Sequence, residues 1–133
     1  MINVKKVLFI CVGNAGRSQM AEALLNAMAR GKALASSAGT MPAERVDPTV
    51  VELMKEEGID ISGSNPRHLM ADMLEGVDRV ITMGCGVEEA CPAVRVPSED
   101  WGLPDPSGKS KEEIRKIRDE IKGRVAKLLQ EIV

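Results

Sequence analysis

The sequence predicts one α/β domain with a four-stranded parallel sheet and helices on both faces. Short apolar runs, typical of buried strands, alternate with segments whose apolar residues recur every three or four positions, as in amphipathic helices. The length of 133 residues suits a single domain, 1–133. Ligands of such sheets bind beyond the carboxyl ends of the strands, so we expect the functional site there.

The first elements are a strand, a loop and a helix. Residues 6–10, Lys-Val-Leu-Phe-Ile, form a continuous apolar run that predicts a buried strand. A glycine-containing loop over 11–18 follows it directly. The next segment, up to about Arg30, carries one apolar helical face. This order is half of a βαβ unit.

A second strand and helix follow. Small apolar residues over 33–38 predict a short strand. Asp47 supplies an N-cap and Pro48 suits the first helical position, so a helix begins here and ends at Gly58.

The second half of the chain is less regular until its end. We expect a short helix over 66–75, a third strand over 78–83 and a short fourth strand over 93–96. Residues 97–108 contain three prolines and two glycines and predict a long loop, which in a compact domain is more often functional than not. A capping box at 110–113 predicts the start of the last helix.

Composition excludes several classes of protein. The hydrophobic content of 44% exceeds that of disordered chains, and a net charge of -2 is far from the basic balance of nucleic-acid-binding domains. The longest apolar run, 7–12, is too short for a signal peptide or a membrane span. We therefore expect a cytoplasmic monomer without nucleic-acid or membrane partners.

The sharpest motif lies at the first turn from strand to helix, where Cys11 is followed after five residues by Arg17 and Ser18. Amides in such a turn can surround an oxyanion at the helix N-terminus, and the guanidinium offers a planar fork to two of its oxygens. The same field favours a Cys11 thiolate, to which Ser18 can donate a hydrogen bond. The candidate oxyanion-binding residues are Val12, Gly13, Asn14, Ala15, Gly16, Arg17 and Ser18.

Two other interpretations apply to this motif. Cys11 can be a core thiol and Arg17 a surface cation, but the position at a strand-to-helix junction with glycines inside favours a site. A nucleotide-binding P-loop does not fit, because the required spacing of two glycines before a lysine is missing.

The residues Cys-Val-Gly-Asn-Ala-Gly-Arg-Ser over 11–18, Ser-Ala-Gly over 37–39 and the pair Asp105-Pro106 resemble the low-molecular-weight protein tyrosine phosphatase family. The segments 83–92 and 99–106 resemble its arsenate reductase branch, which thioredoxin or a related thiol system recycles. The resemblance implies Cys11 as nucleophile, Arg17 with the loop as oxyanion cradle, and Asp105 as general acid. Many relatives carry a second loop cysteine where this chain has Gly16.

Cys85 and Cys91 distinguish a reductase from a phosphatase. Reduction of As(V) to As(III) takes two electrons, which a pair of thiols supplies when it forms a disulfide. The resemblance implies a relay from Cys11 to Cys85 to Cys91. The alternatives are buried core thiols, or a zinc site with Cys11 and His68, for which the spacing and a fourth ligand are missing. We expect no metal and no cofactor.

The sequence thus favours an arsenate reductase whose partners are arsenate, mimicked by phosphate or sulfate, and thioredoxin or a related thiol reductant. The first alternative is a low-molecular-weight protein tyrosine or small-molecule phosphatase that uses Cys11, Arg17 and Asp105. Ser107 and Gly108 stand where phosphotyrosine enzymes of this fold carry tyrosines, which favours a small inorganic anion. A module that senses oxyanions or redox state without catalysis is the other alternative, and Asp105 can be a simple turn residue.

Overall fold

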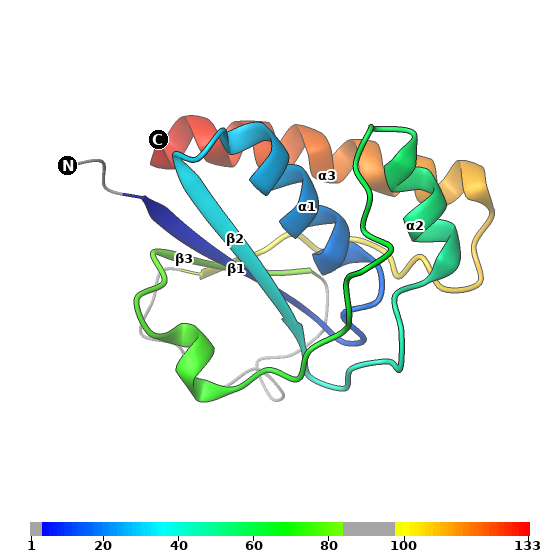
Figure 1. Ribbon diagram of the computed structural model, residues 1–133, viewed down its shortest axis with the longest axis horizontal. Coiled ribbons are helices and arrows are strands. Elements are labelled where there is room, and N and C mark those ends of the chain that lie inside the picture. Colours follow the sequence, from blue (N-terminus) through cyan, green and yellow to red (C-terminus); the bar gives the residue numbers. More distant parts are fainter. Residues whose placement is uncertain (1–3, 84–97) are drawn as a thin grey trace.

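The computed structural model describes residues 4–83 and 98–133 of the chain (Figure 1). These residues form strands and α-helices, together with one short 3₁₀ helix, η1. In chain order the elements are β1 (Lys5–Cys11), α1 (Arg17–Ala29), β2 (Ala33–Gly39), α2 (Pro48–Lys55), η1 (Ala71–Leu74), β3 (Arg79–Thr82), β4 (Ser98–Asp100) and α3 (Lys111–Ile132).

The four strands form one parallel sheet in the order β2-β1-β3-β4, which confirms the predicted sheet. Cys11, the last residue of β1, pairs with Gly39, the last residue of β2. Thr82 at the end of β3 pairs with Asp100 at the end of β4. The carboxyl ends of all four strands therefore lie along one edge of the sheet.

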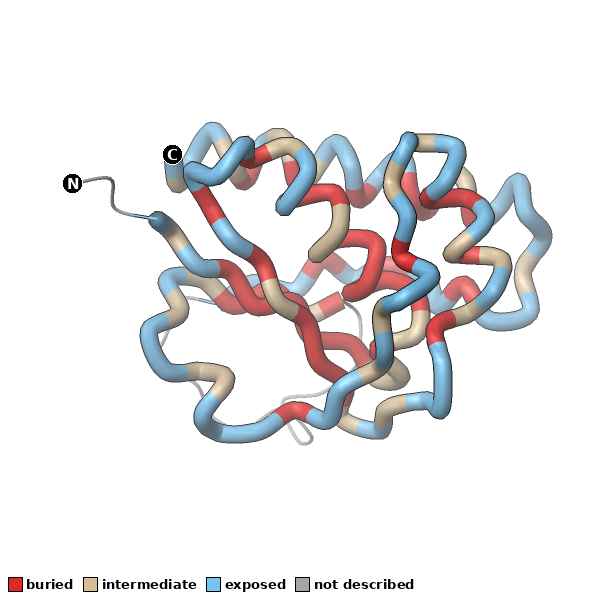
Figure 2. Tube along the Cα trace, in the orientation of Figure 1, coloured by how far each residue is buried: buried red, intermediate tan, exposed pale blue. Residues whose placement is uncertain are grey.

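The sheet separates two apolar layers, because alternate residues of a strand point to opposite faces. Val7 and Phe9 belong to a core with side chains of α1, α2 and α3, so these three helices lie on one face (Figure 1). Leu8 and Ile10 belong to a smaller core on the other face, against which Leu74 of η1 packs. Figure 2 shows the buried residues along the central strands and the inner sides of the helices.

Two helices begin where the sequence predicts. The Asp47 carboxylate accepts a hydrogen bond from the Thr49 amide at 2.9 Å, and Pro48 is the first residue of α2. The Ser110 hydroxyl accepts a hydrogen bond from the Glu113 amide at 3.2 Å, which is the N-cap half of the expected capping box of α3, and the hydroxyl also donates to the Glu113 carboxylate at 3.1 Å. Within the described residues no helix is both long and apolar enough to cross a membrane.

The predicted helix over 66–75 is wrong except for the single turn of η1. Its first half instead pairs with the end of β2: the Gly39 amide donates to the Arg67 carbonyl at 2.8 Å, and the Leu69 amide donates to the Gly39 carbonyl at 2.9 Å. These long-range backbone bonds override the local helical preference of the segment.

The predicted loop over 97–108 is wrong at its start, because residues 98–100 form β4. All three residues of β4 are exposed, so no apolar pattern signals the strand, and pairing with β3 decides its conformation. The fourth strand predicted over 93–96 lies outside the described residues.

Candidate active site

The Cys11 loop, defined as residues 11–18, leaves the carboxyl end of β1 and leads into α1. It packs closely on the end of β2. A Cβ atom on Gly39 would lie 2.5 Å from the Val12 carbonyl oxygen and 3.0 Å from the Cβ atom of Asn14. Because any side chain at position 39 would displace the loop, Gly39 fixes where the loop lies relative to the sheet.

The segment 40–47 holds the carbonyl groups of the Cys11 loop. Its amides donate from Thr40 to Cys11 at 3.1 Å, and at 2.9 Å each from Met41 to Val12, from Ala43 to Gly13 and from Asp47 to Ala15. Among the hydrogen bonds of the described residues, none uses the amides of Gly13, Ala15, Gly16, Arg17 or Ser18 as donors, and α1 has no side-chain cap. A helix-initiating loop with bonded carbonyls and available amides is suited to bind an anion.

The sulfur of Cys11 is buried and surrounded by hydrogen-bond donors. The Asn14 amide donates to Cys11 Sγ at 3.1 Å, and Ser18 Oγ lies 2.8 Å from the same sulfur. Asn14 Nδ2 donates to Ser18 Oγ at 2.6 Å, so the hydroxyl hydrogen of Ser18 is available for Cys11. The Asn14 amide is therefore one donor to the sulfur, and the Ser18 hydroxyl can be a second.

Asn14 reaches these partners because its backbone adopts the left-handed region, with φ of 50°. Asparagine tolerates this conformation better than most residues. Within the Cys11 loop, Asn14 is the residue with a positive φ; Gly13 and Gly16 have none.

Arg17 is the first residue of α1 and is 5% exposed. Its Nη1 donates to the carbonyl of Met83, which follows β3, and to that of Leu103 at 2.9 Å. Among the described residues no carboxylate lies within 4.0 Å of its guanidinium. A buried cation without an ion pair is costly, so the arrangement favours an anion beside it.

Asp105 lies on the surface next to the Cys11 loop. It lines a hollow of about 240 Å³ together with Ala15 and Gly16. Its Oδ1 accepts a hydrogen bond from the Ser107 amide at 2.9 Å, so the turn that the sequence suggests as an alternative role is present as well. A Cβ atom on Gly16 would lie 2.6 Å from Pro106 Cγ, which shows how closely the Asp105 segment approaches the loop.

A polar layer behind the loop includes residues that the sequence analysis missed. Gln19, 3% exposed, donates from Nε2 to Asn14 Oδ1 at 3.0 Å, and the Arg67 amide donates to the same oxygen at 2.9 Å. Gln19 could have been found in the sequence as a polar residue next to the apolar face of the first helix. The spacing of apolar residues alone does not identify it. Burial raises the pKa of Glu22, and the nearby Arg67 and the hydrogen bond from Ser37 offset part of this rise.

The other predicted cysteines, Cys85 and Cys91, lie outside the described residues. His68, the remaining ligand of the alternative zinc site, bonds through Nδ1 with the Leu69 carbonyl at 2.9 Å. In the described parts of the chain, no three His, Cys, Asp or Glu residues gather where they could hold a metal ion.

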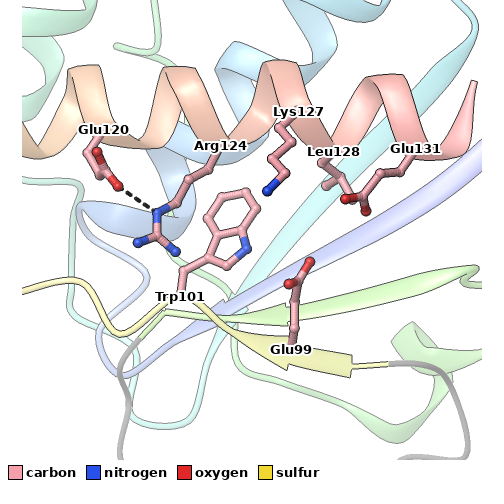
Figure 3. Close-up of a pocket in the computed structure, with 7 residues that line it drawn as sticks. All are labelled: Glu99, Trp101, Glu120, Arg124, Lys127, Leu128 and Glu131. Atoms are coloured by element: carbon pink, nitrogen blue, oxygen red, sulfur yellow. Dashed lines mark hydrogen bonds and ion pairs between the residues drawn. The ribbon is translucent and has the colours of Figure 1, made fainter.

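A second hollow, of about 360 Å³, lies between β4 and α3 (Figure 3). Arg124 lies over the Trp101 ring at 6.0 Å and bonds with Glu120 at 2.9 Å. The lining combines charges of both signs and shares no residue with the Cys11 loop; it consists of Glu99, Trp101, Glu120, Arg124, Lys127, Leu128 and Glu131. With no cysteine, serine or threonine among these residues, the Cys11 loop is the better candidate for catalysis.

Comparisons with known proteins show the family of the chain. Residues 6–133 match the family of low molecular weight phosphotyrosine protein phosphatases. A putative arsenate reductase of Halobacterium salinarum is 44% identical over 128 residues, which are 92% of this chain and 89% of that protein. A glutaredoxin arsenate reductase of Synechocystis is 40% identical over 133 residues, which are 97% of this chain and 99% of that protein.

A solved structure shows the same fold. The thioredoxin-dependent arsenate reductase of Corynebacterium glutamicum matches with a TM-score of 0.84 at 42% identity. The match covers 97% of this chain but 62% of that chain, so this chain spans less than two thirds of that protein's length.

Proposed function

Since the chain belongs to the low molecular weight phosphotyrosine protein phosphatase family, and within it to the arsenate reductases, we propose that it reduces arsenate to arsenite in the Cys11 loop. The observation that carries this proposal is the buried Cys11 sulfur, which accepts a hydrogen bond from the Asn14 amide and lies 2.8 Å from Ser18 Oγ, beside a buried Arg17. A thiolate and an oxyanion are the two partners that this arrangement suits.

Arsenate binds through the amides of the Cys11 loop and the guanidinium of Arg17. Nη1 of Arg17 is occupied by two carbonyls, so Nε and Nη2 are the donors that we assign to the oxyanion. The bound anion neutralises the buried cation, which makes anion binding favourable in this setting. Phosphate and sulfate, which have the same tetrahedral shape, bind in the same place.

The first step forms a bond between Cys11 sulfur and arsenic. The Cys11 thiolate attacks As(V), and one arsenic–oxygen bond breaks while Asp105 supplies a proton to the departing oxygen, which leaves as water or hydroxide. Asp105 lines a hollow together with Ala15 and Gly16 of the Cys11 loop, and this proximity to the loop supports the role.

The reduction itself uses two further cysteines. The Cys85 thiolate attacks Cys11 sulfur, the sulfur–arsenic bond breaks, and its electron pair stays on arsenic as As(III), so that arsenite leaves and a disulfide forms. Cys91 then attacks Cys85 and releases the Cys11 thiolate. An external dithiol, thioredoxin or a related protein, reduces the remaining disulfide. The roles of Cys85 and Cys91 rest on the sequence and the family.

A phosphatase is the second candidate, because it needs the same Cys11 and Arg17 of the Cys11 loop, and Asp105 lines a hollow with Ala15 and Gly16 of that loop. Such an enzyme forms a phosphocysteine and hydrolyses it without any change of oxidation state. Ser107 and Gly108 offer no aromatic wall for a phenyl ring, which favours the inorganic substrate.

Two assays on the purified chain separate the candidates. With arsenate, thioredoxin and its reductase, we expect steady arsenite release; with an aryl phosphate such as p-nitrophenyl phosphate, we expect hydrolysis that is far slower. Cys91→Ser is the matched variant, because it stops the relay and leaves every residue of a phosphatase site in place. Rapid aryl phosphate hydrolysis without arsenite release would contradict the proposal.

A further inference from the structure

Gln19 begins a chain of hydrogen bonds that ends at the Cys11 sulfur. Its Nε2 donates to Asn14 Oδ1 at 3.0 Å and to the Asn65 carbonyl at 3.3 Å. The Arg67 amide donates to the same Asn14 oxygen at 2.9 Å. An amide oxygen that accepts two hydrogen bonds cannot exchange places with its NH₂ group without losing both, so the orientation of the Asn14 side chain is fixed.

The fixed orientation of Asn14 determines the direction of the next bond. Its NH₂ group faces Ser18 and donates to Ser18 Oγ at 2.6 Å. Ser18 has a single hydroxyl hydrogen, and with Asn14 as donor on one side this hydrogen points to Cys11 Sγ, 2.8 Å away. If the Asn14 amide were reversed, Ser18 would donate to Asn14 and the sulfur would lose one of its two donors.

We propose that Gln19 is a positioning residue for Cys11, because its hydrogen bond to Asn14 keeps the Ser18 hydroxyl donating to the thiolate. Gln19 touches neither the sulfur nor the anion-binding amides in the described contacts; it acts through Asn14 and Ser18. The inference rests on one part of the proposed function, that Cys11 reacts as a thiolate, and is independent of the relay.

The burial of Gln19 supports a directional role. The side chain is 3% exposed, and a buried carboxamide lowers stability unless it is hydrogen-bonded. Its neighbours Met20 and Ala21 are fully buried apolar residues, so packing alone does not call for a polar group here. One hydrogen bond of Gln19 goes to the Cys11 loop, and the other goes to Asn65, two residues before the segment 67–69 that pairs with Gly39.

The test measures the thiolate of Cys11 directly, by its absorbance at 240 nm as a function of pH. Cys85→Ser and Cys91→Ser leave Cys11 as the single thiol, and the chain has no tyrosine to absorb at high pH. Gln19→Met keeps the length of the side chain and removes the donor without adding charge. We expect it to raise the pH of half-ionisation by about half to one unit, as expected for weakening one hydrogen bond to a charged group.

A double-variant comparison isolates the route through Ser18. Ser18→Ala removes the last donor of the chain and should raise the same midpoint at least as far as Gln19→Met does. Adding Gln19→Met to Ser18→Ala should then change nothing further, because the route to the sulfur is already broken. The charged side chains around the loop are the same in all variants: Arg17, Glu22, Arg45, Asp47, Arg67 and Asp105.

Asn26→Leu is the control for a purely structural effect. Asn26 also lies on α1 and uses its carboxamide for two hydrogen bonds, with the Ala35 amide at 2.7 Å and the Ala35 carbonyl at 3.1 Å. Its loss should lower the melting temperature without moving the midpoint. Phosphate affinity should change by less than about threefold in Gln19→Met, because the hydrogen bonds that hold the carbonyls of the Cys11 loop remain.

Three outcomes overturn the inference. The first is an unchanged midpoint in Gln19→Met; the second is a further shift when Gln19→Met is added to Ser18→Ala; the third is an equal shift in Asn26→Leu. If the wild-type Cys11 still forms a thiolate below alkaline pH, each of these outcomes leaves the proposed function intact. A wild-type Cys11 that forms no thiolate below alkaline pH would overturn the proposed function itself.

Discussion

At the scale of single residues, Arg17 supplies a buried positive charge beside the Cys11 loop. Two carbonyls from the ends of β3 and the loop after β4 hold its Nη1, so the plane of the guanidinium is set before any ligand arrives. Lysine has one positive centre and cannot bond two carbonyls and present a planar fork at once. Position, and not charge alone, is therefore what Arg17 supplies.

Arg17→Lys should weaken phosphate binding by about 10- to 100-fold, the loss expected when a charge-assisted hydrogen bond is removed. Isothermal titration with phosphate measures this directly. Arg45→Lys is the control, because Arg45 is an exposed cation beside the same loop and its replacement should have little effect. Equal affinities of Arg17→Lys and the wild type would refute the assigned role.

Asp105→Asn tests proton donation with the turn preserved. An asparagine oxygen can still accept the hydrogen bond from the Ser107 amide, so the substitution removes the acid and keeps the local structure. We expect the first chemical step to slow by about 10²- to 10⁴-fold with little change in anion binding. Stopped-flow or quenched-flow measurement of a single arsenate turnover gives this rate.

Asp60→Asn is the matched control for Asp105→Asn. Asp60 accepts a hydrogen bond from the Ser62 amide at 2.9 Å in the same kind of turn, on another part of the surface. It should leave the rate unchanged. If Asp105→Asn also turns over at the wild-type rate while chemistry limits turnover, Asp105 is a turn residue.

At the scale of elements, a cluster of ion pairs joins α2 to α3. Glu56 follows α2 and bonds to Arg115 at 2.7 Å and to Arg118 at 2.8 Å. Arg118 also donates to the Leu53 carbonyl at 2.9 Å. Hydrogen bonds from Arg115 and Arg118 lower the pKa of Glu56 from 4.5 to about 2.

Glu56→Gln should lower the melting temperature at neutral pH. The folded pKa of Glu56 is lowered, so its contribution to stability is present above pH 4.5 and is lost as the pH falls through about 2. The difference between wild type and variant should therefore shrink as acid is added, which thermal unfolding followed by circular dichroism can show. Glu44→Gln, at an exposed carboxylate without an ion pair among the described residues, should have no effect. A difference that stays constant down to pH 2 would contradict the assignment.

Elements with strong local signals could be predicted from the sequence, and elements formed by long-range pairing could not. The caps at Asp47 and Ser110 are local patterns, and both helices begin there. By contrast, β4 consists of three exposed residues, and the segment from Arg67 to Leu69 pairs with Gly39, far away in the sequence. No local pattern encodes such partners.

The same distinction holds for the site. The spacing from Cys11 to Arg17 at a strand-to-helix turn predicts the loop, because its geometry is local. The groups that hold the loop come from elsewhere in the chain, such as the amides of 40–47 and the Met83 carbonyl. Gln19 lies within the predicted helix, but its partner Asn14 becomes an acceptor only in the folded loop.

For the whole molecule, the parallel sheet explains why one edge holds the chemistry. The carboxyl ends of the four strands bring together Cys11 from β1, Gly39 from β2, Met83 after β3 and Leu103 after β4. Each contributes a nucleophile, a close contact or a carbonyl to the same small volume. This agrees with the general position of ligand sites in parallel sheets, beyond the carboxyl ends of the strands.

We propose that the disulfide formed between Cys11 and Cys85 is transferred to Cys85 and Cys91. Mass spectrometry of Cys91→Ser after one exposure to arsenate without reductant tests this relay most directly. We expect about one arsenite per protein and a disulfide between Cys11 and Cys85, because the resolving thiol is missing. Cys85→Ser should release no arsenite under the same conditions. The relay would be contradicted if Cys91→Ser turned over with thioredoxin at the wild-type rate. Arsenite release without any disulfide at Cys11 would contradict it as well.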